Sequence, residues 1–239
     1  MKETAKDTSG SASLSAEAYL ILRERILRGE LPIGQVVSRR KIAVELGMSM
    51  LPVSEALQRL ELEGLLESRP RAGTRVKIPT ENEVRGHYVV REALEVQAAK
   101  LFAEVATASE RADLQKLAAR VDALSTKAGK DRFLYLSLHE KLHRRIAEGA
   151  HCQPLCDAIE KNQVLASTWL CVPRTKSTNE PARRHQELAA TLCNESPKVA
   201  AEAMRKHVQN ALKNTLSRLE SYFQIRQTAQ TVFTRSSKA

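Results

Sequence analysis

Residues 42–65 read IAVELGMSMLPVSEALQRLELEGL, and this stretch decides how the N-terminal part of the chain folds. A short helical pattern ends at Gly47, a residue type that accepts the left-handed backbone of a sharp helix end. Ser49 can cap a second, longer helix, and Pro52 is tolerated in its first turn. The second pattern places apolar residues three and four apart and stops at Gly64. Two helices joined by a tight glycine turn predict a helix-turn-helix unit, although an ordinary helical hairpin has the same pattern.

A β-ribbon is predicted directly after the second helix. Residues 65–78, LLESRPRAGTRVKI, indicate a strand, a turn at Pro70–Gly73 and a returning strand. The ribbon is basic, and no acid follows Glu67 within it. A ribbon of this charge suits a phosphate backbone, so the pattern favours a DNA-binding winged helix over a plain hairpin. The basic residues of the ribbon are Arg69, Arg71, Arg75 and Lys77.

Residues 15–78 resemble the winged-helix domain of the GntR family of bacterial transcription regulators. Most of the remaining chain resembles the helical effector domain, called FCD, of the FadR-like branch. The resemblance implies a ligand-responsive regulator, acting as a repressor, that binds a double-stranded DNA operator as a homodimer and responds to a small organic acid. The segments that carry it include Pro32–Ile33–Gly34, Leu46–Gly47–Met48–Ser49, Pro52–Val53, Glu55–Ala56–Leu57 and Glu63–Gly64–Leu65.

The residues expected to read the operator depart from the family's usual pattern. Where the family has Ser-Arg-Thr-Pro-Val-Arg-Glu-Ala, this chain has SMLPVSEA, so Met50 and Ser54 replace two arginines. Arginine paired with guanine is the commonest specific base contact, so the usual operator bases are not expected to be read in the usual way. Met50 and Leu51 could touch a thymine methyl group and Ser54 a phosphate or base edge; weak or lost DNA binding is the alternative. The expected DNA-binding residues are Arg39, Arg40, Ser49, Met50, Leu51, Ser54, Arg69, Arg71 and Gly73.

From Glu81 onwards the pattern is helical throughout, which predicts an antiparallel bundle and a mainly α protein. The expected helices cover 81–107, 110–128, 131–148, 154–171, 180–194 and 197–223. The expected organisation is a disordered arm (1–14), a winged helix-turn-helix domain (15–78), a helical ligand-binding and dimerisation domain (79–226) and a flexible tail (227–239).

Histidines are the informative residues of the helical part. His139 and His143 lie four apart in HEKLH and share one helix face, where neutral imidazoles can bind one metal ion; core or surface histidines have the same spacing. The resemblance implies a divalent metal site at His139, His143, His185 and His207, with His139 where an Asp is usual. Either all four bind, or His139 turns away and only His143, His185 and His207 bind. Imidazole ligands favour zinc or nickel over manganese, and a carboxylate effector would supply the missing negative charge.

The other charged residues and histidines near this pattern receive weaker assignments. Arg91, in VREALE, is expected either to contact the effector or to pair with Glu95. The arginines next to the histidines in sequence are expected mostly to point elsewhere; they are Arg144, Arg145, Arg183 and Arg184. His87 and His151 fall outside the pattern and are expected at the surface.

Composition and motif searches limit the alternatives. The chain has 239 residues, a net charge of +10, four cysteines without a CxxC pair, and no signal peptide or long apolar run, which predicts a cytoplasmic protein with reduced thiols and no membrane partner. HEKLH also matches the string of zinc peptidases, so a helical metal-dependent hydrolase is one alternative. A regulator that senses the metal ion itself is another.

Overall fold

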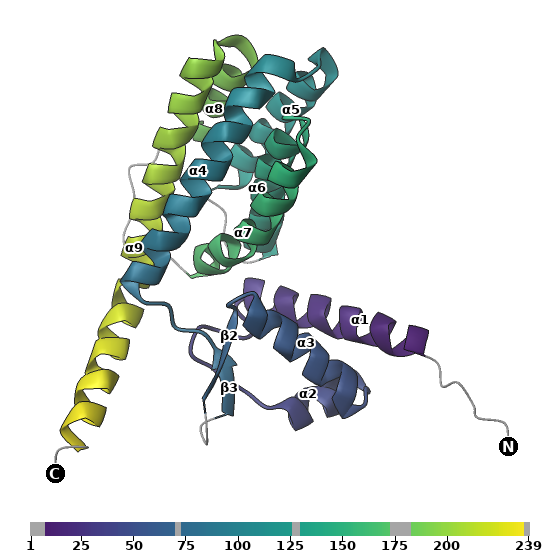
Figure 1. Cartoon of the computed structure of the whole chain (residues 1–239), viewed down its shortest axis with the longest axis vertical. Helices are drawn as coiled ribbons and strands as arrows, with labels where there is room; N and C mark the ends of the chain where they lie inside the picture. Colours follow the sequence, from purple (N-terminus) through teal and green to yellow (C-terminus); the bar gives the residue numbers. More distant parts are fainter. Residues whose placement is uncertain (1–7, 70–72, 126–129, 173–182, 237–239) are drawn as a thin grey trace, which may run out of the picture. The chain divides into compact units, whose positions relative to one another are not determined.

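The computed structural model describes residues 8–69, 73–125, 130–172 and 183–236 (Figure 1). The chain divides into two compact units, residues 1–78 and 79–239. The first contains a small sheet and three helices, and the second is helical wherever it is regular. None of the described helices is long and apolar enough to cross a membrane.

The N-terminal unit is a winged helix-turn-helix. Its helices α1, α2 and α3 precede a β-ribbon, and β1 joins the ribbon to make a three-stranded antiparallel sheet in the order β1-β3-β2. Within the ribbon, Glu67 lies opposite Arg75. The elements are α1 (Thr8–Leu27), β1 (Val36–Val37), α2 (Arg39–Leu46), α3 (Met50–Leu62), β2 (Leu66–Arg69) and β3 (Gly73–Val76).

Local chemistry explains the sharp bend between α2 and α3. The Ser38 hydroxyl accepts the Lys41 backbone N–H at 3.3 Å and caps the start of α2. Gly47 adopts φ 62° at the end of α2, a conformation that costs glycine little, and its N–H bonds back to the helix carbonyls. Ser49 occupies the N-cap position of α3, as expected, although its side chain makes no capping hydrogen bond.

Two helices extend further than the sequence pattern predicted. Helix α1 begins at Thr8, so residues 8–14 are helical and not part of a disordered arm. Helix α9 runs to Ser236 and includes most of the segment expected to be a flexible tail. Extending an existing helix adds one hydrogen bond per residue fixed, and no glycine or proline follows Pro197 to stop α9.

The second unit is a bundle in which α4 packs against α6, α7, α8 and α9 (Figure 1). Capping boxes start two of its helices: the Thr80 and Glu83 side chains exchange hydrogen bonds with backbone N–H groups at the start of α4, and Thr107 and Glu110 do so at α5. The helices are α4 (Glu81–Val105), α5 (Ala108–Leu124), α6 (Lys130–Glu148), α7 (Gln153–Cys171), α8 (Arg184–Asn194) and α9 (Pro197–Ser236).

Candidate metal centre and DNA-reading face

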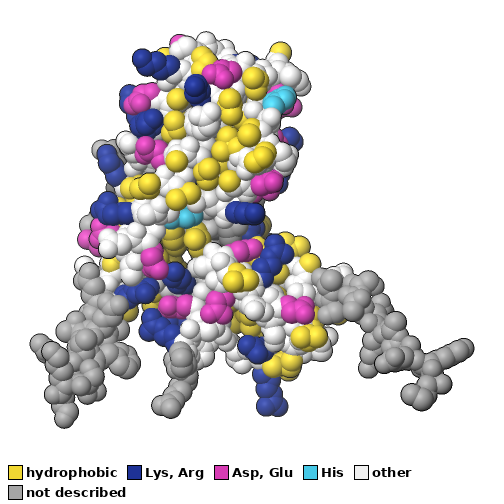
Figure 2. Space-filling view, in the orientation of Figure 1, with side chains coloured by type: hydrophobic (Ala, Val, Ile, Leu, Met, Phe, Trp, Pro, Cys, Tyr) yellow, Lys and Arg dark blue, Asp and Glu magenta, His cyan; other side chains and the backbone are white. Residues whose placement is uncertain are grey.

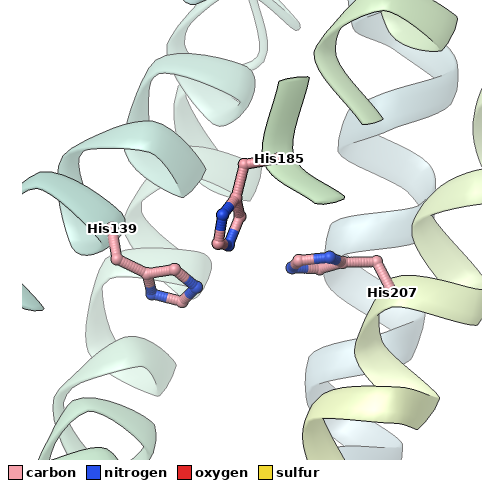
Figure 3. A group of neighbouring side chains, drawn as sticks. All are labelled: His139, His185 and His207. Carbon is pink, nitrogen blue, oxygen red and sulfur yellow. The ribbon is translucent and has the colours of Figure 1, made fainter. Parts of the chain in front are cut away.

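Three histidines from three helices of the bundle point toward one another. His139 comes from α6, His185 from α8 and His207 from α9, and one ring nitrogen of each lies within 4.8 Å of the others (Figure 3). His139 and His185 are buried and His207 is partly exposed. Three different helices thus bring three imidazoles to one point, which is the number and type of ligand that a divalent transition metal uses.

His143 lies beside this group, one helical turn along α6 from His139. Its ring centroid is 4.7 Å from that of His139 and 5.3 Å from that of His207, and its Nε2 is 3.3 Å from Nε2 of His139. The four histidines singled out in the sequence therefore do come together. The close group of three nevertheless contains His139, the position where the family usually has an Asp, and leaves out His143.

Two carboxylates contact the Nδ1 atoms of two of the imidazoles. Asp122 Oδ1 lies 2.5 Å from Nδ1 of His185, and Glu95 Oε2 lies 2.8 Å from Nδ1 of His143. At His185 the carboxylate favours the proton on Nδ1 and leaves Nε2 as an acceptor, the arrangement found behind many metal ligands. The contact between Glu95 and His143 is close but lacks hydrogen-bond geometry. Nε2 of His185 and Nε2 of His207 are buried and have no hydrogen-bond partner among the residues that the structure describes.

The electrostatics favour the neutral form of His139, His185 and His207. Burial lowers the pKa of His139 and His207 well below the ordinary value, and the neighbouring imidazoles and Arg91 act in the same direction. Burial also lowers the pKa of His185, despite the hydrogen bond to Asp122 that opposes it. Neutral imidazole is the form that binds a metal ion, so the cluster does not have to lose protons first.

Arg91 forms a buried ion pair behind His143. Its Nε donates to Oε1 of Glu95 at 2.6 Å, both side chains are almost completely buried, and Nη2 of Arg91 lies 3.4 Å from Nε2 of His143. Burial alone would raise the pKa of Glu95, but Arg91 and His143 hold it well below its usual range. Of the two expectations for Arg91, pairing with Glu95 is the contact seen in the structure.

Arg184 contacts Tyr135, a residue beside the cluster, although the arginines next to the histidines were expected mostly to point elsewhere. Its Nη2 donates to the Tyr135 hydroxyl at 2.8 Å, and the Tyr135 ring stacks on His139 with centroids 5.7 Å apart and planes 29° apart. Arg184 is the first residue of α8. Side chains on a helix lean toward its N-terminus, which carries this one off the end of α8 toward Tyr135 on α6. Periodicity within one helix could not reveal this contact.

The two remaining histidines differ in exposure. His151 is exposed, as expected, and its Nε2 lies 3.1 Å from a carboxylate oxygen of Glu110. His87 is half-buried rather than at the surface, with its ring 5.0 Å from that of Trp169 and its Nδ1 3.5 Å from Nδ2 of Asn162. Burial lowers the pKa of His87 to about 4. Its neighbours come from α7, which sequence spacing on α4 alone could not reveal.

The N-terminal end of α3 presents the residues expected to read DNA. Met50 is 46% exposed and Leu51 is 61% exposed, while Ser49 is exposed beside them. Ser54 is half-buried, and its hydroxyl donates to the backbone carbonyl of Met50 at 2.6 Å. That bond uses the hydroxyl proton, so Ser54 retains only acceptor capacity toward DNA.

The remaining expected DNA contacts lie on α2 and on the ribbon. Arg39, Arg40, Arg69 and Gly73 are exposed, whereas Arg71 lies outside the described residues. Glu67 is 2.6 Å from Arg75 and 3.6 Å from Arg69, so this acid offsets part of the positive charge predicted for the ribbon. Figure 2 shows Lys and Arg side chains on both units, interspersed with Asp and Glu.

Comparisons with known proteins cover both units. Residues 14–76 match the family described as bacterial regulatory proteins, gntR family, and residues 87–210 match the FCD domain. A protein named "Probable D-xylose utilization operon transcriptional repressor", from Paenarthrobacter nicotinovorans, is 29% identical over 221 residues, 90% of this chain and 94% of that protein. The HTH-type transcriptional repressor RspR of Escherichia coli (strain K12) is 27% identical over 199 residues, 82% of this chain and 86% of that protein.

Solved structures share the fold. A transcriptional regulator GntR from Rhodococcus sp. RHA1 superposes with a TM-score of 0.71 at 20% identity, covering 85% of this chain and 98% of that one. The E. coli protein McbR/YncC gives a TM-score of 0.66 at 22% identity, covering 88% and 98%. At this level of identity the likeness concerns the arrangement of the helices and strands alone.

Proposed function

This chain belongs to the GntR family of bacterial transcription regulators and carries an FCD domain, and from that premise we propose that its helical unit binds one divalent transition metal and a small carboxylate effector. Regulators of this family bind DNA operators. We further propose that the chain is a repressor and a homodimer, because each winged helix would then occupy one half of a near-palindromic operator. The effector would release DNA by favouring one of two states of the protein.

The observation that carries the metal proposal is a pair of buried ring nitrogens, Nε2 of His185 and Nε2 of His207, which lie beside His139 and have no hydrogen-bond partner among the described residues. A buried polar atom without a partner costs about 1–3 kcal/mol, and a metal ion would remove that cost for both atoms at once. His139, His185 and His207 would hold the ion, and His143 would be a fourth ligand or an adjacent contact. Asp122 and Glu95 would keep two of the four rings oriented.

The ligand chemistry points to zinc or nickel. Imidazole suits both ions, whereas manganese prefers oxygen ligands. A set of neutral imidazoles leaves the ion its full charge, and that charge would attract the carboxylate of an effector. The hydrolase alternative is set aside, because both matched domains and the similar curated proteins are those of transcription regulators.

The metal proposal is tested by elemental analysis of the full-length chain purified without a histidine tag. We expect about one zinc or nickel ion per chain in the wild type and strongly reduced content in His207→Ala, because one ligand is removed. His151→Ala is the matched control, since His151 is exposed and lies outside the cluster. Equal metal content in all three proteins, or none in any under metal-replete conditions, would leave the four histidines as ordinary bundle residues.

The regulatory part is tested by fluorescence anisotropy on an operator fragment. Wild-type protein is titrated after EDTA treatment, after zinc addition, and with zinc plus an organic acid. Release only with the acid supports an acid-responsive regulator. Release with zinc alone would identify the ion itself as the effector, and His207→Ala should then no longer respond to zinc.

A further inference from the structure

We propose that Gln58, on the face of α3 opposite its buried side, reads an adenine in each half of the operator. This residue was not among those expected to contact DNA, and it extends the reading surface from the start of α3 toward its middle. The proposal concerns the base sequence that the winged helix selects, so it does not depend on the proposed metal ion or effector.

The core leaves one face of α3 free. The buried residues of this helix lie on one side of it, and successive residues turn by about 100° around the helix axis. The direction opposite the buried side therefore falls on Leu51 and Gln58, which are both exposed. Gln58 follows Leu51 by seven residues, almost two full turns, so the two side chains lie in line along the helix. The buried residues are Pro52, Val53, Ala56, Leu57 and Leu60.

The polar side chains on either flank of this free face are already engaged with the protein. On one flank, the Arg59 guanidinium lies 3.7 Å from the centroid of the Tyr19 ring, and its Nε donates to Glu63 at 3.2 Å. On the other flank, the Glu61 carboxylate accepts the Ser68 backbone N–H at 2.9 Å and the Ser68 hydroxyl at 3.0 Å. These contacts tie α3 to α1 and to β2, and they use the functional groups of both flanking residues.

On the free face itself, two polar side chains remain available. The Ser54 hydroxyl is used within the helix, because it donates to the Met50 carbonyl. Glu55 and Gln58 are exposed and make no hydrogen bond or ion pair with other residues that the structure describes. Together with Leu51 and Ser54, they have the spacing i, i+3, i+4 and i+7 by which a recognition helix in the major groove reaches base edges. Gln58 is the free amide in this set.

The chemistry of the free face favours a base over a phosphate as the partner of Gln58. A surface that binds the phosphate backbone is basic, whereas this face carries the apolar Leu51 and the acidic Glu55. A glutamine amide pairs with adenine through two hydrogen bonds, in which Nε2 donates to N7 and Oε1 accepts from N6. The simpler alternative is a contact between Gln58 and the DNA backbone. That contact would affect all DNA sequences about equally, so base preference distinguishes the two roles.

The experiment measures base preference with the full-length protein and no added acid. The wild type first selects its operator from a randomised DNA pool, and each base pair of that operator is then replaced in turn by the other three. Fluorescence anisotropy at one salt concentration gives the Kd of the wild type and of Gln58→Ala for every fragment. We expect one adenine in each half-site whose replacement weakens wild-type binding about tenfold, the effect of one bidentate pair. In Gln58→Ala, the four fragments that differ at this position should have Kd values within about twofold of one another.

Gln58→Glu gives an independent result at the same position. A carboxylate accepts hydrogen bonds but donates none, so this variant should prefer cytosine, whose N4 amino group is a donor. It also serves as the test if Gln58→Ala does not fold. Gln115→Ala is the matched control, because it removes the same amide from an exposed position on α5, and it should keep the adenine preference.

An equal loss of affinity for every fragment in Gln58→Ala would overturn the inference, since it would indicate a backbone contact or a change in folding. An unchanged profile in that variant would also overturn it, as would a wild type that selects no sequence from the pool. None of these outcomes bears on the metal proposal, because metal content is measured separately.

Discussion

Glu95 connects the buried Arg91 guanidinium to the histidine cluster of the helical unit. Its two oxygens contact different partners, Oε1 the guanidinium of Arg91 at 2.6 Å and Oε2 the Nδ1 atom of His143 at 2.8 Å. Arg91 and Glu95 carry full charges in a nearly dry environment, where removing one partner of an ion pair leaves the other charge buried without compensation. This residue therefore links the stability of the bundle to the geometry of the histidine cluster.

We expect Glu95→Gln to destabilise the chain by about 3–5 kcal/mol, because Arg91 would stay charged and buried without its acid. The double variant Arg91→Met, Glu95→Leu should lose less, since it removes both charges and retains apolar volume. Urea unfolding followed by circular dichroism in the presence of EDTA measures both without a contribution from metal. A double variant that is less stable than Glu95→Gln would show that the pair itself supplies net stability.

Tyr19 gives the N-terminal unit a dependence on alkaline pH. Its hydroxyl donates to Glu63 at 2.7 Å, and burial, with that carboxylate, raises the pKa of Tyr19 from 10.0 to about 12. Because the folded protein favours the neutral phenol, this stabilisation is complete below about pH 10 and is lost as the pH rises toward 12.

Tyr19→Phe should therefore cost about 1.5 kcal/mol near pH 8, the value of a hydrogen bond to a charged group, and less near pH 12. Phenylalanine retains the ring that the Arg59 guanidinium covers at 3.7 Å. The difference in unfolding free energy between the two proteins, measured from pH 8 to 12, isolates Tyr19 from the other titrating groups. A difference that stays constant over this range would contradict the shifted pKa.

Among the elements, α3 decides how the operator is read. Its exposed N-terminal residues are apolar, and the Ser54 hydroxyl bonds within the helix. We expect Ser54→Arg to change base preference toward guanine at one position of each half-site, by about 1–3 kcal/mol, because a guanidinium can pair with the guanine edge. Selection from a randomised DNA pool measures this preference. Ser137→Arg, at an exposed position on α6, is the matched control. An unchanged preference in Ser54→Arg would place this residue away from the bases.

Local sequence patterns determine some of the elements, and packing determines where others end. The glycine turn at Gly47, the ribbon after α3 and the helical second unit follow from local periodicity and turn chemistry, and the structure has all three. The predicted ends of α1 and α9 were wrong, because weak helix formers such as Ser and Thr do not stop a helix that is already formed.

The candidate site was predictable only as a set of residues. Spacing places His139 and His143 on one face, and the resemblance adds His185 and His207, but which three nitrogens lie closest depends on how α6, α8 and α9 pack. The approach of Arg184 to Tyr135 and the position of Asp122 behind His185 join separate helices. No spacing along one helix encodes such contacts.

For the whole molecule, the question is how one small reading unit obtains useful affinity. The N-terminal unit has its own core, in which Leu22, Val53, Leu60 and Leu65 are buried. One winged helix covers one half-site, and phosphate contacts alone give weak, salt-sensitive binding. Linking two readers through paired helical units would make the second contact intramolecular, at a high effective concentration. This is the physical reason to expect the homodimer to be held mainly by the helical unit.

We expect the full-length chain to be a dimer at micromolar concentration and the fragment 1–78 to be a folded monomer. The fragment should bind a single half-site about as well as it binds the full operator, whereas the full-length chain should bind the full operator about a hundredfold or more tightly than the fragment does, because only the dimer engages both half-sites. Sedimentation velocity gives the assembly state, and anisotropy at fixed salt gives the affinities. Far-ultraviolet circular dichroism of the fragment confirms that it is folded before binding is compared. A full-length chain that sediments as a monomer, or a folded fragment that binds the whole operator as tightly as the full-length chain, would show that the helical unit does not join the two readers.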